Sequence, residues 1–192
     1  MDKIPLTASS TDKLPEEAYI QAVTIPFISH WSKIRCGSYT AEWVARVIGV
    51  KPKPVPVNSI LRGPVWFDVF RPVLPYDMGK LLRFKGMKSL QVRLSEFSNR
   101  EKIRWIKNQI VSTNRPPILL IRTKVLHWIA VAGYDDKKEL FYVYDSRFGK
   151  NSLDSKMPIG NFTFSYDDLL SRWNGRWNLR FIALVITDID TE

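Results

Sequence analysis

The hydrophobic pattern of the chain changes near residue 117, and this change limits the folds that the chain can adopt. Before that point, apolar residues recur at helical spacing in residues 37–48 and 99–112. After it, apolar and polar residues follow strand-like patterns, in residues 117–122, 127–134, 139–145 and 179–187. This order predicts an α+β fold, in which an N-terminal helical half packs on a C-terminal antiparallel sheet.

A single domain of residues 21–192 is expected, preceded by a flexible polar lead of residues 1–20. The chain has 192 residues, which is long enough to bury one hydrophobic core. No apolar run approaches the roughly 18 residues of a membrane span, and the first residues lack the apolar segment of a signal peptide. The sequence therefore predicts a cytoplasmic protein that makes no membrane contact.

The chain has one cysteine, Cys36, at the start of the helix predicted for residues 37–48. One cysteine cannot form an internal disulfide, and with only two histidines a metal site is not expected. We expect no cofactor. A lone cysteine is commonly a small buried side chain. A helix N-terminus, however, lowers the pKa of a thiol, because its unpaired N–H groups stabilise the thiolate.

Two further residues can complete a thiol-based active site. His127 opens one predicted strand and Asp145 closes the next, and a loop at 135–138 would place His127 opposite residue 145 or 146. An imidazole can take the proton of Cys36 and return it to a leaving group, while a carboxylate orients the imidazole. Each residue alone has an ordinary structural interpretation, so the prediction depends on all three together.

Four segments of the chain resemble papain-like cysteine peptidases, closest to the bacteriocin-processing (double-glycine leader) branch. "CGSYTAEWVARVIG" resembles the cysteine helix of that branch, and "HWIAVAGYDDKKELFYVYDSRFG" resembles its histidine hairpin. "VSTNRPPILLIR" and "FTFSYDDLLSRWNGRW" resemble the strand before that hairpin and the helix after it. The resemblance implies a papain-like fold, and a cysteine hydrolase that cleaves a peptide or amide bond through a thioester.

The resemblance also implies roles for individual residues. Cys36 would be the nucleophile, His127 the general base and acid, and Asp145 the residue that orients the imidazole. The family has a glutamine about six residues before the cysteine, where this chain has His30. His30 and the backbone N–H of Cys36 are therefore the candidate oxyanion hole. Residues predicted to contact substrate are Gly37, Trp66 and Trp128.

Two alternative functions remain open at this stage. The thioester could pass to an amine instead of water, which would make the protein an acyltransferase or transamidase. The fold could also be a catalytically weak module that binds an anionic partner, because residues 80–124 carry twelve basic and two acidic residues and so account for the net charge of +10. Nucleic-acid binding is less favoured, since no recognised motif for it is present.

The same positive charge leads to a hypothesis about the partner, which is a peptide or protein substrate of acidic character. Clusters of like charge attract ligands of opposite charge, and the effect weakens as salt screens it. We expect acidic peptides to be cleaved or bound in preference to basic ones at low salt. Equal preference for the two in a peptide-library assay would reject the hypothesis.

Overall fold

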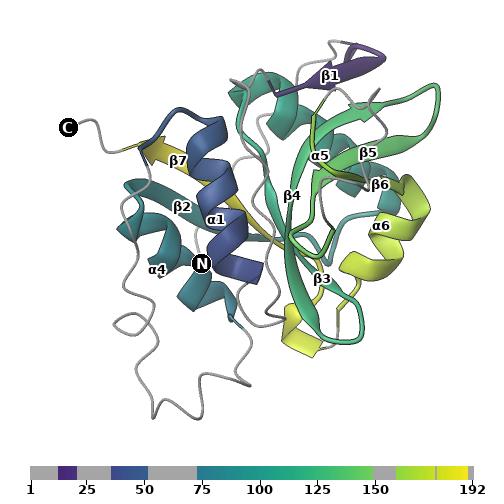
Figure 1. Ribbon diagram of the computed structural model, residues 1–192. Coiled ribbons are helices and arrows are strands. Elements are labelled where there is room, and N and C mark those ends of the chain that lie inside the picture. The colour runs from purple at the N-terminus through teal and green to yellow at the C-terminus, as the bar shows by residue number, and fades with distance from the viewer. Residues whose placement is uncertain (1–12, 21–35, 52–72, 149–158, 176, 190–192) are drawn as a thin grey trace.

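The computed structural model describes residues 13–20, 36–51, 73–148, 159–175 and 177–189. These residues form one antiparallel sheet flanked by helices (Figure 1). The strands are β1 (Glu17–Tyr19), β2 (Met87–Arg93), β3 (Ile118–Arg122), β4 (Leu126–Asp135), β5 (Leu140–Tyr144), β6 (Phe162–Ser165) and β7 (Ile182–Ile189). The helices are α1 (Cys36–Val47), α4 (Pro75–Phe84), α5 (Asn99–Thr113), α6 (Tyr166–Trp173) and the short 3₁₀ helix η2 (Trp177–Leu179).

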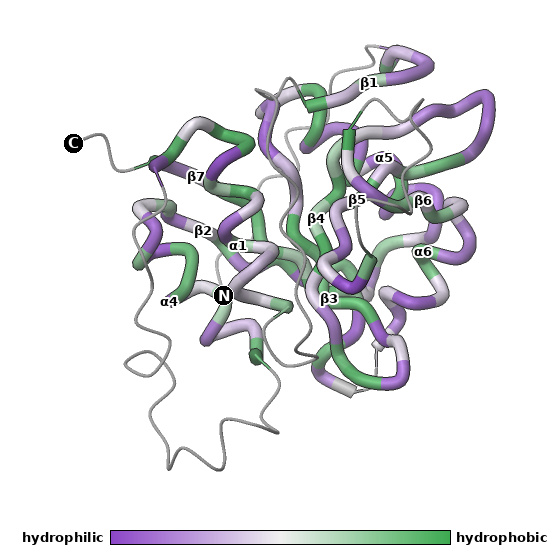
Figure 2. Tube along the Cα trace, in the orientation of Figure 1, coloured by the Kyte–Doolittle hydropathy of each residue, from purple (hydrophilic) through white to green (hydrophobic). Residues whose placement is uncertain are grey.

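The sheet has the order β2-β7-β3-β4-β5-β6, and β1 pairs with β4 beyond the end of β3. All of these strand pairs are antiparallel. In the part of the chain that the structure describes, four helices and a sheet built largely from the C-terminal half confirm the predicted α+β class. Hydrophobic residues gather on the central strands, and the tip of the β4–β5 hairpin is hydrophilic (Figure 2).

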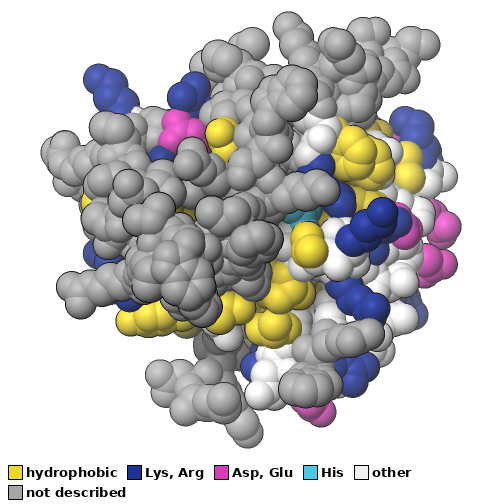
Figure 3. All heavy atoms as spheres, turned by 60° about the horizontal axis from the view of Figure 1, so that its bottom comes forward, with side chains coloured by type: hydrophobic (Ala, Val, Ile, Leu, Met, Phe, Trp, Pro, Cys, Tyr) yellow, Lys and Arg dark blue, Asp and Glu magenta, His cyan; other side chains and the backbone are white. Residues whose placement is uncertain are grey.

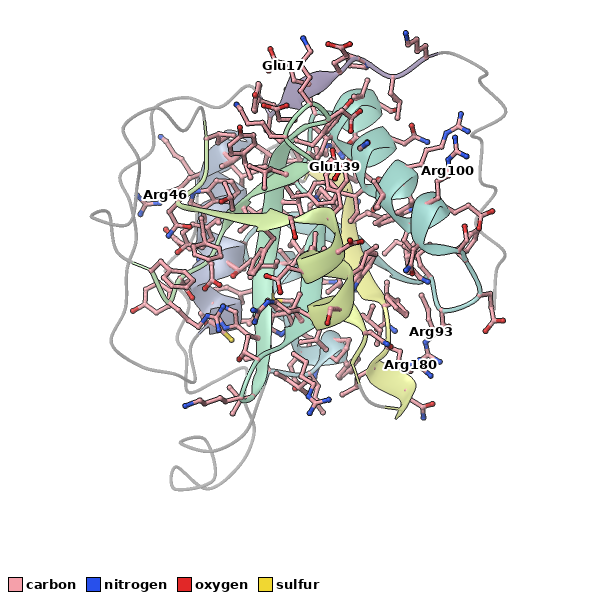
Figure 4. All side chains as sticks on the ribbon, turned by 90° about the vertical axis from the view of Figure 1, so that its right-hand side faces the viewer. Glu17, Arg46, Arg93, Arg100, Glu139 and Arg180 are labelled. Atoms are coloured by element: carbon pink, nitrogen blue, oxygen red, sulfur yellow. The ribbon has the colours of Figure 1, made fainter. Side chains whose placement is uncertain are left out.

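Helices cover both faces of the sheet at β4. Figure 4 shows α1 and α5 on opposite sides of this strand, and both contact it. As a result, every residue of β4 after Leu126 is buried, although alternation along the strand would allow one polar face. The strand that carries His127 therefore lies in the middle of the hydrophobic core.

Local sequence signals explain where the helices begin and end. α5 starts with a capping box, in which the Ser98 side chain accepts a hydrogen bond from the N–H of Glu101, whose carboxylate accepts one from the N–H of Ser98. Ser165 caps α6 in the same position. Beyond the end of α1, Gly49 has a φ of +80°, which a glycine adopts without steric cost. The predicted helix boundaries are therefore close to those observed.

Three strands were not predicted. Glu17–Tyr19 was assigned to the flexible lead, but these residues pair with Gly133–Asp135 and so belong to the sheet, which corrects that assignment. Three residues are too few to show a period. β2 has an irregular burial pattern because its pairing with β7 shifts at Lys88 and Ser89, which obscures its alternation. β6 has only four residues.

The observed β4–β5 hairpin is shifted by one or two residues relative to the predicted one. Asp135 pairs with Leu140, so the loop is 136–139 rather than 135–138, and it closes with Glu139 at a φ of 53°. The ladder between β4 and β5 ends with the pair of Ala130 and Tyr144. If this register continued for three more residues on each strand, His127 would lie opposite residue 147. Asp145 instead leaves the ladder and enters a turn, in which its carbonyl accepts a hydrogen bond from the N–H of Phe148.

Candidate active site

The start of α1 is attached directly to β4. The Thr40 hydroxyl, one turn into the helix, donates a hydrogen bond of 3.0 Å to the carbonyl of Trp128. Gly37 allows a further close contact, because a Cβ at this position would lie 2.9 Å from Cγ1 of Val73. These contacts hold the Cys36 end of α1 beside the His127 end of β4.

His127 and Asp145 form a buried pair. Nε2 of His127 lies 2.7 Å from Oδ1 of Asp145, and the two side chains are 2% and 0% exposed. A carboxylate only accepts hydrogen bonds, so Nε2 carries a proton and donates it. Nδ1 is then the ring nitrogen left to interact with Cys36.

The environment of Cys36 favours the thiolate. Burial by itself raises the pKa of the thiol, since it disfavours the charged form. The hydrogen bond to His127, the charge of that imidazole and backbone hydrogen bonds from Trp128 and Gly37 act in the opposite direction. Together they hold the pKa of Cys36 below its ordinary value.

The pKa values of His127 and Asp145 move apart. Burial lowers the pKa of His127, but its hydrogen bonds to Asp145 and Cys36 raise the pKa above its usual value. Burial likewise opposes ionisation of Asp145, yet the partners His127 and Arg147 lower its pKa to about 2. Around neutral pH the carboxylate is therefore charged, and a protonated imidazole next to a thiolate is stabilised.

Two residues that hold Asp145 were missed by sequence reasoning. The Arg147 side chain contacts both carboxylate oxygens, with Nη2 lying 2.6 Å from Oδ2 and Nε lying 3.1 Å from Oδ1. Asn161 is fully buried; its Oδ1 accepts from the N–H of Asp145, and its Nδ2 donates to the carbonyls of Asp145 and Phe148. Arg147 follows Asp145 by only two residues, so the sequence could have indicated it as a partner of the carboxylate. No local sequence pattern indicates Asn161.

The remaining predicted site residues have different outcomes. Gly37 lies next to Cys36 in α1, and Trp128 lies next to His127 in β4. The Trp128 side chain is 1% exposed, and its indole N–H donates to the carbonyl of Val73. Contact of Gly37 and Trp128 with substrate stays a prediction. His30 and Trp66 lie outside the described residues.

Within the described ranges, no group of three or more His, Cys, Asp or Glu side chains is arranged to hold a metal ion. These same ranges contain no helix that is long and apolar enough to cross a membrane.

The outer surface near a histidine is rich in positive charge. Figure 3 shows a small area of histidine surface with lysine and arginine side chains next to it. Arg147 contributes to this charge, because its side chain remains 33% exposed while it binds Asp145.

Comparison with known proteins identifies the fold. No protein-family model matches the chain, and no curated protein matches its sequence. Among solved structures, the chain is similar to a double glycine motif protease from an AMS/PCAT transporter, solved in complex with the leader peptide. The identity is 14%, the TM-score is 0.52, and the match covers 88% of this chain and 92% of the other. The chain therefore has a papain-like α+β fold, which agrees with the resemblance seen in the sequence.

Proposed function

We propose that the protein is a cysteine peptidase that cleaves peptide bonds through a thioester, with Cys36, His127 and Asp145 as its catalytic triad. The observation that carries this proposal is the buried contact of 2.7 Å between Nε2 of His127 and Oδ1 of Asp145, next to a helix-start cysteine whose pKa the imidazole lowers. A thiol with a lowered pKa next to an oriented imidazole is the arrangement that thiol catalysis requires.

In the first half of the reaction, the thiolate of Cys36 attacks the carbonyl carbon of the scissile bond. The oxyanion that forms is stabilised by N–H donors, for which the backbone N–H of Cys36 and the side chain of His30 are the candidates. The imidazolium of His127 then gives its proton to the leaving amine, and the C–N bond breaks. The products of this half are a thioester on Cys36 and a free amine.

In the second half, neutral His127 removes a proton from a water molecule, which attacks the thioester carbonyl. The C–S bond breaks, the peptide acid leaves, and the thiolate–imidazolium pair forms again. Asp145 keeps Nε2 protonated and facing away from the thiol in both halves, so that Nδ1 carries all the proton transfers.

One observation supports a peptide as substrate, and a second supports acidic character of that peptide. The structural neighbour was solved with a leader peptide, and the surface near the histidine carries lysine and arginine side chains. Cleavage of acidic peptide segments is the form of the proposal that this charge favours.

The proposal is tested by the pH dependence of Cys36 alkylation with iodoacetamide. Only the thiolate reacts, so an activated thiol is modified at a pH well below the unperturbed pKa of about 8.5. We expect wild-type protein to react in this way and His127→Ala to lose the low-pH reaction. Because Cys36 is the only cysteine, mass spectrometry reads a single site.

A matched control is Thr113→Val, which removes an exposed hydroxyl that binds the Gln109 carbonyl at the end of α5 and leaves α1 and the triad side chains in place. This variant should keep an activated thiol. If wild-type Cys36 reacts as an ordinary thiol, or if His127→Ala retains the low-pH reaction, the proposed triad is wrong.

A further inference from the structure

The carboxylate of Asp145 binds two cationic partners. Oδ1 faces Nε2 of His127 at 2.7 Å, while Oδ2 lies 2.6 Å from Nη2 of Arg147. Nε of Arg147 is 3.1 Å from each oxygen, and the backbone N–H of Arg147 donates to Oδ1 at 3.0 Å. The guanidinium is permanently charged, whereas the imidazole gains and loses a proton.

The guanidinium of Arg147 is itself held in place. It lies over the ring of Phe148, with Cζ 5.3 Å from the ring centroid, and that ring stacks on Phe162 at 4.2 Å. Asn161 ties the backbone of the same turn by donating to the carbonyls of Asp145 and Phe148. A planar, supported guanidinium that contacts both oxygens fixes the plane of a carboxylate, which a flexible ammonium does not.

We propose that Arg147 is a positioning residue, which acts through Asp145 by turning Oδ1 toward His127 and by taking part of the carboxylate charge away from the imidazolium. This inference rests on the proposed function. As a consequence, the thiolate–imidazolium pair has an upper pH limit, at which the His127 imidazolium loses its proton. This limit lies at a lower pH than it would if Asp145 acted without Arg147. A like charge on a shared carboxylate disfavours the protonated imidazole.

Among the residues that the structure describes, the other titratable groups around the pair do not duplicate this charge. Cys36 on α1 faces the imidazole and favours its protonated form. Tyr144 on β5 lies near Asp145, but burial raises its pKa well above the usual range, so it is neutral. Tyr39 and Glu42 on α1 act on Tyr144, and Glu42 is already paired with Lys85 and Arg46.

The test compares wild type with Arg147→Gln and Arg147→Lys. Glutamine removes the charge, and lysine keeps it without the planar fork. Iodoacetamide alkylation of Cys36 is followed from pH 4 to pH 10, with the imidazole C–H resonances recorded by NMR over the same range. The chain has two histidines, so the His127→Ala spectrum assigns the signal.

We expect the His127 imidazolium of Arg147→Gln to lose its proton at a pH about 0.5 to 1 unit higher than in wild type. Removing a nearby, partly screened positive charge has an effect of about this size. Arg147→Lys should stay close to wild type in this limit. The control is Arg172→Gln, which removes an arginine that binds the carboxylate of Asp168 on α6, and this variant should leave the limit unchanged.

An activated wild-type thiol combined with an unshifted or lowered limit in Arg147→Gln would overturn the role of Arg147 and leave the proposed function standing. An ordinary thiol in wild type would overturn both. If Arg147→Gln does not fold, Arg147→Met takes its place, because it also removes the charge: a limit raised by about 0.5 pH unit or more supports the role of Arg147, and an unshifted limit overturns it.

Discussion

Alanine in place of Cys36 should reduce cleavage of a complex peptide mixture by about 10⁴-fold or more, while the protein remains folded. The loss is large because removing a nucleophile removes the covalent route, and the other groups of a triad contribute little without it. The fold should survive because the thiol is small, although Cys36 is only 4% exposed. Mass spectrometry of the products measures the first effect, and thermal unfolding measures the second.

Ser38→Ala is the control for this experiment, because it removes a side-chain oxygen from the same turn of α1 without touching the thiol. It should cleave within a few-fold of wild type. Equal cleavage by wild type and Cys36→Ala would show that the activity does not come from this site.

Replacing Asp145 with asparagine should lower the free energy of unfolding by about 2 kcal/mol at pH 7. Asp145 is 0% exposed, and its pKa falls from 3.8 to about 2 on folding. A lowered pKa means that the charged form is the one stabilised by folding. This stabilisation is complete above the unfolded pKa of about 3.8 and is lost as pH falls toward 2. The difference between wild type and variant should therefore shrink over that acidic range.

Urea unfolding at pH 7 and at pH 3 measures this difference. The control is Asp188→Asn, because Asp188 pairs with Lys88 at 3.1 Å but both side chains are largely exposed, at 60% and 58%. An exposed pair is screened by water, so this variant should leave the free energy of unfolding close to that of wild type. If Asp145→Asn is as mild as Asp188→Asn, the carboxylate does not stabilise the fold.

The contact between His127 and Asp145 could be predicted from sequence because it lies within one hairpin. Two alternating segments joined by a short turn form a hairpin, so the start of the first strand and the end of the second lie at the same edge of the sheet. This holds even though the loop was predicted one residue too early. The position of Cys36 at a helix start was equally readable, because Gly49 and the apolar spacing mark that helix.

The surroundings of Asp145 could not be predicted in the same way. Asn161 reaches Asp145 across 16 residues of chain, and its hydrogen bonds depend on tertiary placement rather than on any period. β1 was missed because three residues pair with β4 only after the rest of the sheet exists. In both places, contacts distant in sequence decide the local structure, and a pattern within one window cannot reveal them.

The two contacts of the proposed triad differ greatly in the length of chain that must be brought together to form them. His127 and Asp145 are 18 residues apart, whereas Cys36 and His127 are 91 residues apart, since 127 minus 36 is 91. A hairpin closes quickly, but docking α1 on β4 must wait for a much longer loop to close. During synthesis the cysteine leaves the ribosome well before the hairpin exists. If the proposed triad is correct, the nascent chain carries an ordinary thiol, and the reactive form appears only when folding is complete.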